Sequence, residues 1–189
     1  MKIKVTILFL LASVFGFSQD LENLKQEVQK IYDLTIEKKY DAVLNYTYPK
    51  IFEIIPKKQF VELMNDALNP EGMTMTIEKV NPEFTFDDFI IIGEGKYCII
   101  EHNNKMTMKF DEEIGDSKEM FLGLVKASMK NYNVTIDEKT EIITLEGKAK
   151  MIAISDKLTN GTWKYVNYNG ESPMMEKVLG KEVLKKLGL

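Results

Sequence analysis

The sequence contains no arginine, so all 25 of its basic residues are lysines, against 29 aspartates and glutamates. The formal net charge is −4. A chain with this balance lacks both the positive field and the bidentate guanidinium donors with which proteins contact phosphates and guanine edges. We therefore expect no nucleic-acid partner. The same lack disfavours tight recognition of a phosphate or carboxylate ligand.

Cysteine and histidine occur once each, as Cys98 and His102. A lone cysteine cannot form a disulfide within the chain. A Ser-His-Asp triad could use only His102, a Cys-His dyad only these two residues, and a zinc site would need several carboxylates. We therefore expect no metal and no cofactor. The apolar segment 97–100 identifies Cys98 as an inert strand residue rather than a reactive thiol.

Long linkers, internal repeats, low-complexity segments and glycine-rich phosphate loops are also missing. Gly93-Glu94-Gly95 precedes a predicted strand, whereas a dinucleotide-binding loop opens a helix.

The N-terminus differs in composition from the rest of the chain. Two lysines there precede an apolar run over residues 5–17, which is the form of a secretory signal peptide.

The apolar run ends in small residues that suit cleavage by signal peptidase. Gly16 and Ser18 fit the −3 and −1 positions, so we expect the mature chain to begin at Gln19. The run is shorter than the roughly 20 residues that a membrane-spanning helix needs, and no other stretch approaches that length. The alternatives are a buried N-terminal helix or a retained anchor. No cysteine follows the run, so we expect a periplasmic or secreted protein that is not a lipoprotein.

Removal of residues 1–18 leaves 171 residues with 23 lysines and a formal charge of −6. That length suits one domain, over residues 19–189, with a sizeable core. Apolar residues at steps of three and four predict helices early in the chain, again before the last strands and at the end. The predicted helices cover residues 21–38, 40–46, 56–68, 117–132 and 174–187.

Alternation of apolar and polar residues replaces the helical period beyond Gly72. It predicts strands over residues 73–77, 84–86, 90–92, 97–102, 105–110, 134–136, 142–145, 148–155 and 162–168. The pair Asn103-Asn104 tolerates the positive φ angles of a tight turn and predicts a hairpin. In that register Tyr97 faces Phe110, Ile99 faces Met108, and Glu101 faces Met106. His102 is then a solvated residue beside the turn.

Two local phrases carry a family resemblance: Lys39-Tyr40-Asp41-Ala42-Val43-Leu44, and the late strand from Gly161 to Tyr168. With three N-terminal helices before a bent antiparallel sheet, they resemble the NTF2-like (cystatin-like, SnoaL-like) superfamily over residues 20–170. The resemblance implies an α+β fold in which N-terminal helices pack on a strongly curved antiparallel sheet that forms a cone. The helices at 117–132 and 174–187 are additions to that pattern.

Members of this superfamily include isomerases, dehydratases and hydrolases, as well as domains that only bind ligands or partners, so the fold does not decide the activity. Its acid-base enzymes hold a carboxyl group in an apolar pocket, where lost hydration raises the pKa. The candidates here are Glu101, Asp33 and Glu53, with Tyr97 as a donor to a developing oxyanion. No catalytic motif of the family can be transferred to these residues.

Two Met-x-Met pairs lie in predicted strands. Thioethers are soft ligands for Cu(I), but the strand spacing and the aromatic neighbours favour core or pocket lining. If the sheet curls, an adaptable apolar pocket is predicted, lined by Met73, Met75, Phe84, Phe86, Tyr97, Met106, Met108, Phe110, Phe121 and Trp163.

Three functions follow from these observations. The leading hypothesis is an exported non-catalytic domain that binds a small apolar ligand or a protein partner. An acid-base enzyme with a pocket carboxylate is the first alternative. The second is a structural module whose cavity is filled by its own side chains and which forms a homodimer through the sheet.

Overall fold

The computed structural model describes residues 20–112, 115–170 and 172–189. The predicted signal peptide and the cleavage site between Ser18 and Gln19 lie outside the described residues. Within the described part, helices surround one seven-stranded antiparallel sheet that does not close on itself, which confirms the α+β class. No helix in that part is long and apolar enough to cross a membrane.

The sheet is built on two long strands, β4 (Gly95–Phe110) and β6 (Ile143–Ser155). They pair over thirteen consecutive positions, from Lys96 opposite Ser155 to Met108 opposite Ile143. The shorter strands follow one another along the outer edges of this ribbon. The edge of β4 carries β1 (Met73–Ile77), β2 (Thr85–Phe86) and β3 (Ile90–Ile92), and the edge of β6 carries β5 (Tyr132–Ile136) and β7 (Lys164–Tyr168).

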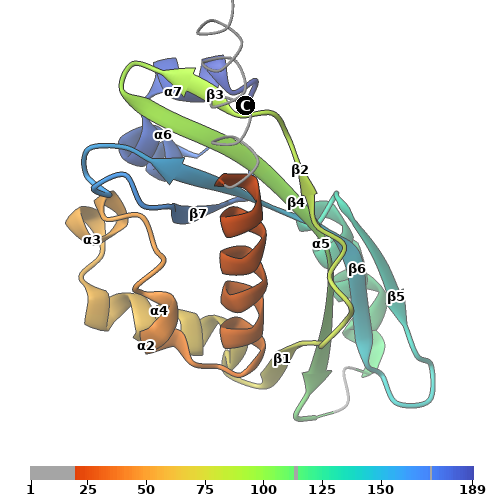
Figure 1. Ribbon diagram of the computed structural model, residues 1–189. Coiled ribbons are helices and arrows are strands. Elements are labelled where there is room, and N and C mark those ends of the chain that lie inside the picture. Colours follow the sequence, from red (N-terminus) through yellow and green to blue (C-terminus); the bar gives the residue numbers. More distant parts are fainter. Residues whose placement is uncertain (1–19, 113–114, 171) are drawn as a thin grey trace, which may run out of the picture.

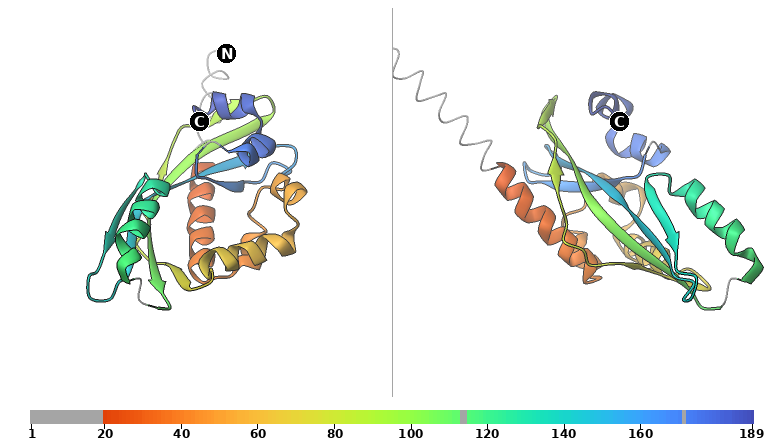
Figure 2. Two further views of the ribbon diagram at one scale, coloured as in Figure 1. Left: turned by 180° about the vertical axis from the view of Figure 1, so that it is seen from behind. Right: turned by 90° about the vertical axis from the view of Figure 1, so that its right-hand side faces the viewer.

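Helices cover the sheet on both sides (Figures 1 and 2). The N-terminal helix, described over residues 20–36, lies on one side, while α5, α6 and α7 lie on the other. The helices that follow the N-terminal helix are α2 (Tyr40–Val43), α3 (Lys50–Ile54), α4 (Lys57–Leu68), α5 (Lys118–Ser128), α6 (Pro173–Leu179) and α7 (Lys181–Lys186).

The β4–β6 ribbon twists strongly along its length. Ile100 packs in a cluster with Leu24 of the N-terminal helix, and Met108 packs in a cluster with Val125 of α5. Both residues point to the same side of the pleat because they lie an even number of positions apart. The two helices nevertheless lie on opposite sides of the sheet (Figure 2). The ribbon therefore turns this surface from one side of the molecule to the other, in keeping with the strong twist of paired strands.

A third cluster lies on the other side of the pleat. Tyr97 and Ile99 pack there against α6 and α7, together with Tyr48 and Ile51 from the segment around α3. Ser172 caps the start of α6 by accepting a hydrogen bond from the Met175 N–H at 3.2 Å. The C-terminal helices thus cover sheet surface that would otherwise be exposed.

The predicted hairpin at Asn103-Asn104 is wrong, because β4 continues straight through this pair. Tyr97 lies opposite Ile90 and Ile154, and Met108 lies opposite Met75 and Ile143. Tyr97 and Phe110 therefore do not face each other, and Glu101 lies opposite Thr85 and Lys150 rather than Met106.

Side-chain amides explain why asparagine is used within this strand. Asn103 Oδ1 accepts a hydrogen bond from the Glu83 N–H at 2.7 Å, and its Nδ2 donates to the Asn81 carbonyl at 3.1 Å. These bonds bridge the gap along the β4 edge between β1 and β2, where no strand pairs with it. Asn104 Nδ2 donates to the Tyr132 hydroxyl at 3.2 Å.

Most predicted elements are present with shifted ends. The strand at 73–77 and the helices at 21–38, 56–68 and 117–132 are confirmed to within a few residues. The predicted strands 142–145 and 148–155 form one strand, β6. The predicted helix 174–187 is interrupted at Gly180, whose φ of 84° only glycine adopts readily. Helix α3 was not predicted.

The two hydrogen bonds of the Asn103 side chain to the 81–83 segment should contribute measurably to the stability of the fold. Asn103→Ala removes both hydrogen bonds to the 81–83 segment, and we expect the free energy of unfolding to fall by about 1–2 kcal/mol. Urea denaturation measures the change. Asn133→Ala, at an exposed asparagine of β5, is the matched control and should change the free energy by less than about 0.5 kcal/mol. Equal losses at the two positions would contradict the bridging role.

Candidate functional site

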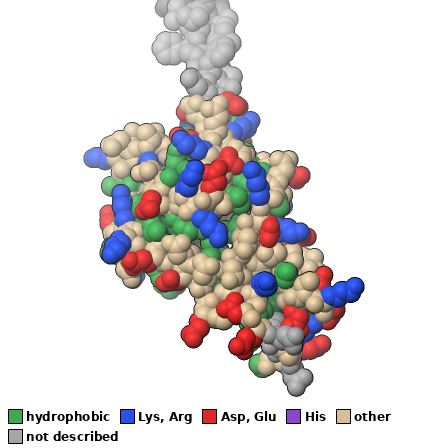
Figure 3. Space-filling view, turned by 90° about the horizontal axis from the view of Figure 1, so that it is seen from below, with side chains coloured by type: hydrophobic (Ala, Val, Ile, Leu, Met, Phe, Trp, Pro, Cys, Tyr) green, Lys and Arg blue, Asp and Glu red, His purple; other side chains and the backbone are tan. Residues whose placement is uncertain are grey.

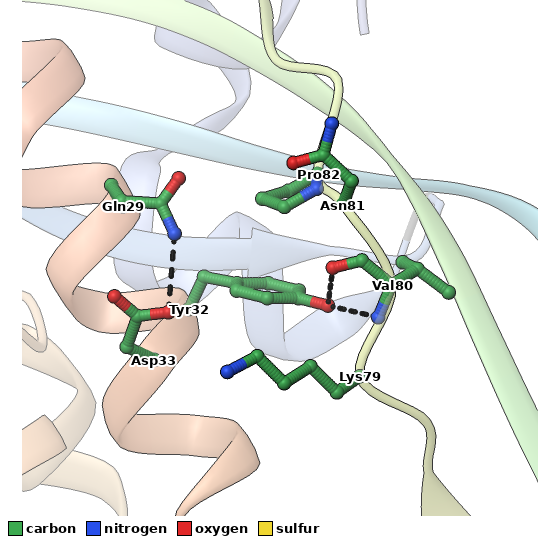
Figure 4. Close-up of a pocket in the computed structure, with 7 residues that line it drawn as sticks. All are labelled: Gln29, Tyr32, Asp33, Lys79, Val80, Asn81 and Pro82. Carbon is green, nitrogen blue, oxygen red and sulfur yellow. Dashed lines mark hydrogen bonds between the residues drawn. The ribbon is translucent and has the colours of Figure 1, made fainter.

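Two open hollows flank the N-terminal helix. The first, which we call the Tyr32 hollow, has a volume of about 470 Å³ and is lined by Gln29, Tyr32, Asp33, Lys79, Val80, Asn81 and Pro82 (Figure 4). The second, the Glu27 hollow, has a volume of about 460 Å³ and is lined by Asp20, Asn23, Gln26, Glu27, Lys30, Tyr46, Gly161, Thr162 and Trp163.

The Tyr32 hollow lies between the N-terminal helix and the segment that joins β1 to β2. Helical spacing places Gln29, Tyr32 and Asp33 on one face of the helix. The Tyr32 hydroxyl donates to the Val80 carbonyl and accepts from the Val80 N–H, both at 2.9 Å. These two hydrogen bonds to the backbone of Val80 hold the segment in place, and the Tyr32 ring spans the space between the two walls (Figure 4).

The two walls of the Tyr32 hollow carry opposite charges. On the helix wall, Gln29 Nε2 donates to Asp33 Oδ1 at 3.1 Å and fixes the direction of this carboxylate. On the facing wall, the Lys79 side chain extends beside the Tyr32 ring with its ammonium group toward the helix (Figure 4). Asn81 adds a side-chain amide on the same wall. The hollow thus offers an anion, a cation and two amides around one aromatic ring.

His102 lies against the same tyrosine but is buried, with 8% of its surface exposed. Its ring makes an edge contact with Tyr32, with centroids 5.9 Å apart, and a tilted contact with Phe84 at 5.4 Å. The expectation of a solvated turn residue is therefore wrong, because the strand continues past His102 and its side chain points toward the N-terminal helix cluster.

The protonation state of His102 follows from its hydrogen bond to a backbone carbonyl. Nδ1 lies 2.9 Å from the Asn103 carbonyl, which can only accept, so Nδ1 carries the hydrogen and Nε2 has the free lone pair. Burial lowers the pKa of the imidazole, and the hydrogen bond to Asn103 opposes this only in part. His102 is therefore a neutral ring in the wall behind Tyr32.

The other residues proposed for catalysis do not converge. Glu101 forms ion pairs with Lys150 at 3.3 Å and with Lys148 at 3.8 Å on a partly exposed sheet face. Tyr97 is buried in the cluster under α6 and α7, where burial raises its pKa. Asp33 lines the Tyr32 hollow, and Glu53 is exposed on α3.

The ten residues predicted to line one apolar pocket lie in three separate clusters. Six of them pack with α5: Met73, Met75, Met106, Met108, Phe110 and Phe121. Three pack with the N-terminal helix: Phe84, Phe86 and Trp163. Tyr97 packs with α6 and α7. Of these ten, only Trp163 borders either of the two hollows.

Cys98 lies in the interior between the sheet and the N-terminal helix. Its side chain is fully buried, and its thiol donates to the Asp87 carbonyl at 3.3 Å. Burial raises the pKa of the thiol to about 12, with a further contribution from the Asp87 carboxylate. The thiol is therefore protonated at neutral pH and is a poor nucleophile.

The Glu27 hollow holds groups that are already bound to one another. The Tyr165 hydroxyl donates to Glu27 Oε2 at 2.9 Å, and burial raises the pKa of this tyrosine strongly. Trp163 stacks on Phe89 at 5.6 Å, and the Lys96 ammonium lies over the Phe89 ring at 4.3 Å. Lys96 also forms an ion pair with Asp20.

The surface has mixed charge. On the underside of the molecule, lysines and acidic residues are interspersed, and neither sign dominates a region of that face (Figure 3). Within the described residues, no three His, Cys, Asp or Glu side chains are grouped closely enough to hold a metal ion. No protein-family model matches the chain, and a search of curated proteins found no similar sequence.

The buried His102 predicts a specific pH dependence of stability. Above pH 6.5, the usual histidine pKa, the ring is neutral in both states. Below it, the unfolded chain gains a proton that the folded chain resists, so stability falls as the pH decreases. We expect His102→Phe to remove this component, which is at most about 1.4 kcal/mol at pH 5.5. Urea denaturation between pH 7.5 and 5.5 measures it, and parallel curves for the two proteins would contradict it.

Proposed function

We propose that this chain is an exported, non-catalytic binding domain, and that the Tyr32 hollow binds a small zwitterion such as an amino acid or a dipeptide. The observation that carries the proposal is the opposite charge of the two facing walls, with Asp33 on the helix and Lys79 on the β1–β2 segment. An ammonium group of the ligand would meet Asp33, and a carboxylate would meet Lys79.

The geometry of the hollow supports a polar ligand rather than an apolar one. Its polar groups are the Gln29 and Asn81 amides and the two charged side chains, with Tyr32 and Pro82 as the apolar surface. The methionines that suggested an apolar ligand pack between the sheet and α5 instead. Since the site is open and holds lysine rather than arginine, each charge contact is weak, and we expect a dissociation constant of about 1 mM.

The positions of the reactive side chains support binding without chemistry. The Cys98 thiol is protonated and donates a hydrogen bond to a backbone carbonyl. The His102 ring is neutral and buried behind Tyr32. Glu101 lies on the opposite side of β4 from His102 and is paired with lysines. A nucleophile and a base within hydrogen-bond reach, as covalent catalysis needs, do not occur among these residues.

Nuclear magnetic resonance titration with L-alanine and L-alanyl-L-alanine tests the proposal. Saturable shifts of the Gln29 and Asn81 side-chain amides are expected at concentrations of about 1–20 mM. Propionate and ethylamine carry one charge each, so each should bind at least about tenfold more weakly, because one charge-assisted contact is lost.

Variants locate the site. Asp33→Asn and Lys79→Met should each weaken zwitterion binding by about tenfold or more. Lys30→Met is the matched control, since Lys30 extends from the same helix into the Glu27 hollow and should leave binding unchanged. Absence of saturable shifts, or equal binding by Lys79→Met and the unchanged protein, would overturn the assignment.

A further inference from the structure

Helix α5 carries apolar residues on two opposite sides, although only one of these sides packs on its own domain. Phe121 and Val125 face the sheet. On the opposite side, Met120 is 67% exposed and Leu124 is 59% exposed, one helical turn apart. Gly123 and Ala127 lie between and beside them and are also exposed. We call these four residues the outer strip of α5. The outer side of a surface helix is normally polar, so large apolar side chains there indicate that this side is covered by a partner.

Gly123 gives the outer strip its shape. A Cβ atom at this position would meet no heavy atom within 4 Å, so nothing inside the protomer requires a glycine there. Glycine weakens a helix interior relative to alanine, and its presence leaves a notch on the exposed surface. A notch flanked by two large apolar side chains suits close approach by a second helix.

We infer that the outer strip binds the same strip of a second copy of this chain, with the two α5 helices antiparallel. A two-fold axis between Gly123 and Leu124 brings the Gly123 notches of the two copies together, with Leu124 of each copy beside Leu124 of the other. The same axis brings Met120 opposite Ala127. The notch thus lets the two helices approach closely, and each apolar strip is covered by the same strip of the other copy, as a self-complementary interface requires.

The charges beside the strip match the same arrangement. Glu119 and Lys126 are both exposed and, at helical spacing, lie along one flank of the strip. In the antiparallel pair, Glu119 of each copy lies beside Lys126 of the other copy. In a parallel symmetric pair, the two charged flanks lie on opposite sides and cannot meet. Lys118, on the inner side, is bound to Glu138 and Glu141 of its own chain.

The open face of the sheet is a poorer surface for self-association. Threonines Thr76, Thr107, Thr144 and Thr135 lie next to one another across β1, β4, β6 and β5 on the side of the pleat away from α5. That side is polar, with no exposed apolar strip. The homodimer expected through the sheet is therefore placed on helix α5 instead.

The size of the contact sets its strength. An 11-residue helix is about 16 Å long. One side of a helix this short buries less surface than the roughly 800 Å² per partner of a standard stable interface. The dimer should therefore form reversibly with concentration. Sedimentation velocity of the full mature chain across a range of concentrations should show the mean mass rising toward twice the monomer mass.

Single substitutions test the strip. Leu124→Glu should reduce dimer affinity at least tenfold, because it places the carboxylates of the two copies side by side in the interface. Leu63→Glu, on α4 with a leucine 46% exposed, is the matched control and should not change it. A monomer at every concentration, or dimerisation unaffected by Leu124→Glu, would overturn the inference.

Charge reversal tests the antiparallel orientation and a second copy as the occupant. Glu119→Lys alone and Lys126→Glu alone should each be monomeric, since each places like charges together. Mixed in equal amounts, the two variants should form heterodimers, because every pair across the interface is then opposite in charge. A mixture that stays monomeric where the unchanged protein dimerises would exclude this arrangement.

Discussion

The pairing of β4 with β6 is the constraint on which the rest of the structure depends. Thirteen consecutive residue pairs form one uninterrupted antiparallel ladder. Each short strand adds to an outer edge of this ladder, and each of the three apolar clusters contains residues from both long strands. The ladder is long enough to twist substantially. One side of its pleat is consequently covered by the N-terminal helix at one end and by α5 at the other (Figure 2).

The hollow at Tyr32 is a consequence of how the edge of this ladder is completed. Between β1 and β2 no strand pairs with β4, and the chain there leaves the sheet toward the N-terminal helix. Asn103 holds the segment from the sheet side, and Tyr32 holds it from the helix side through Val80. The gap between these two attachments brings Lys79 opposite Asp33. A strand of regular pairing would have closed that gap.

Periodicity in the sequence identified most elements but not their continuity. Helices with clear three- and four-residue spacing, such as 20–36 and α4, and the alternating strand β1 were predicted because their own residues determine them. Asn103-Asn104 has the composition of a turn, and only the partners of its side chains, at 81, 83 and 132, explain why the chain stays extended. Contacts of that kind are set by tertiary structure, so local composition does not reveal them.

That single error determined what could be inferred about the site. A two-residue turn places residues 97, 99 and 101 on the same face as 106, 108 and 110, which implied one apolar surface. In a continuous strand these two sets point to opposite sides, because the side-chain period is two. Tyr97 therefore lies under α6 and α7, while Met108 lies under α5. His102 moves from a solvated turn to the interior for the same reason. It lies behind a hollow that joins residues of the N-terminal helix to residues 79–82, and of these the sequence pattern singled out only Asp33.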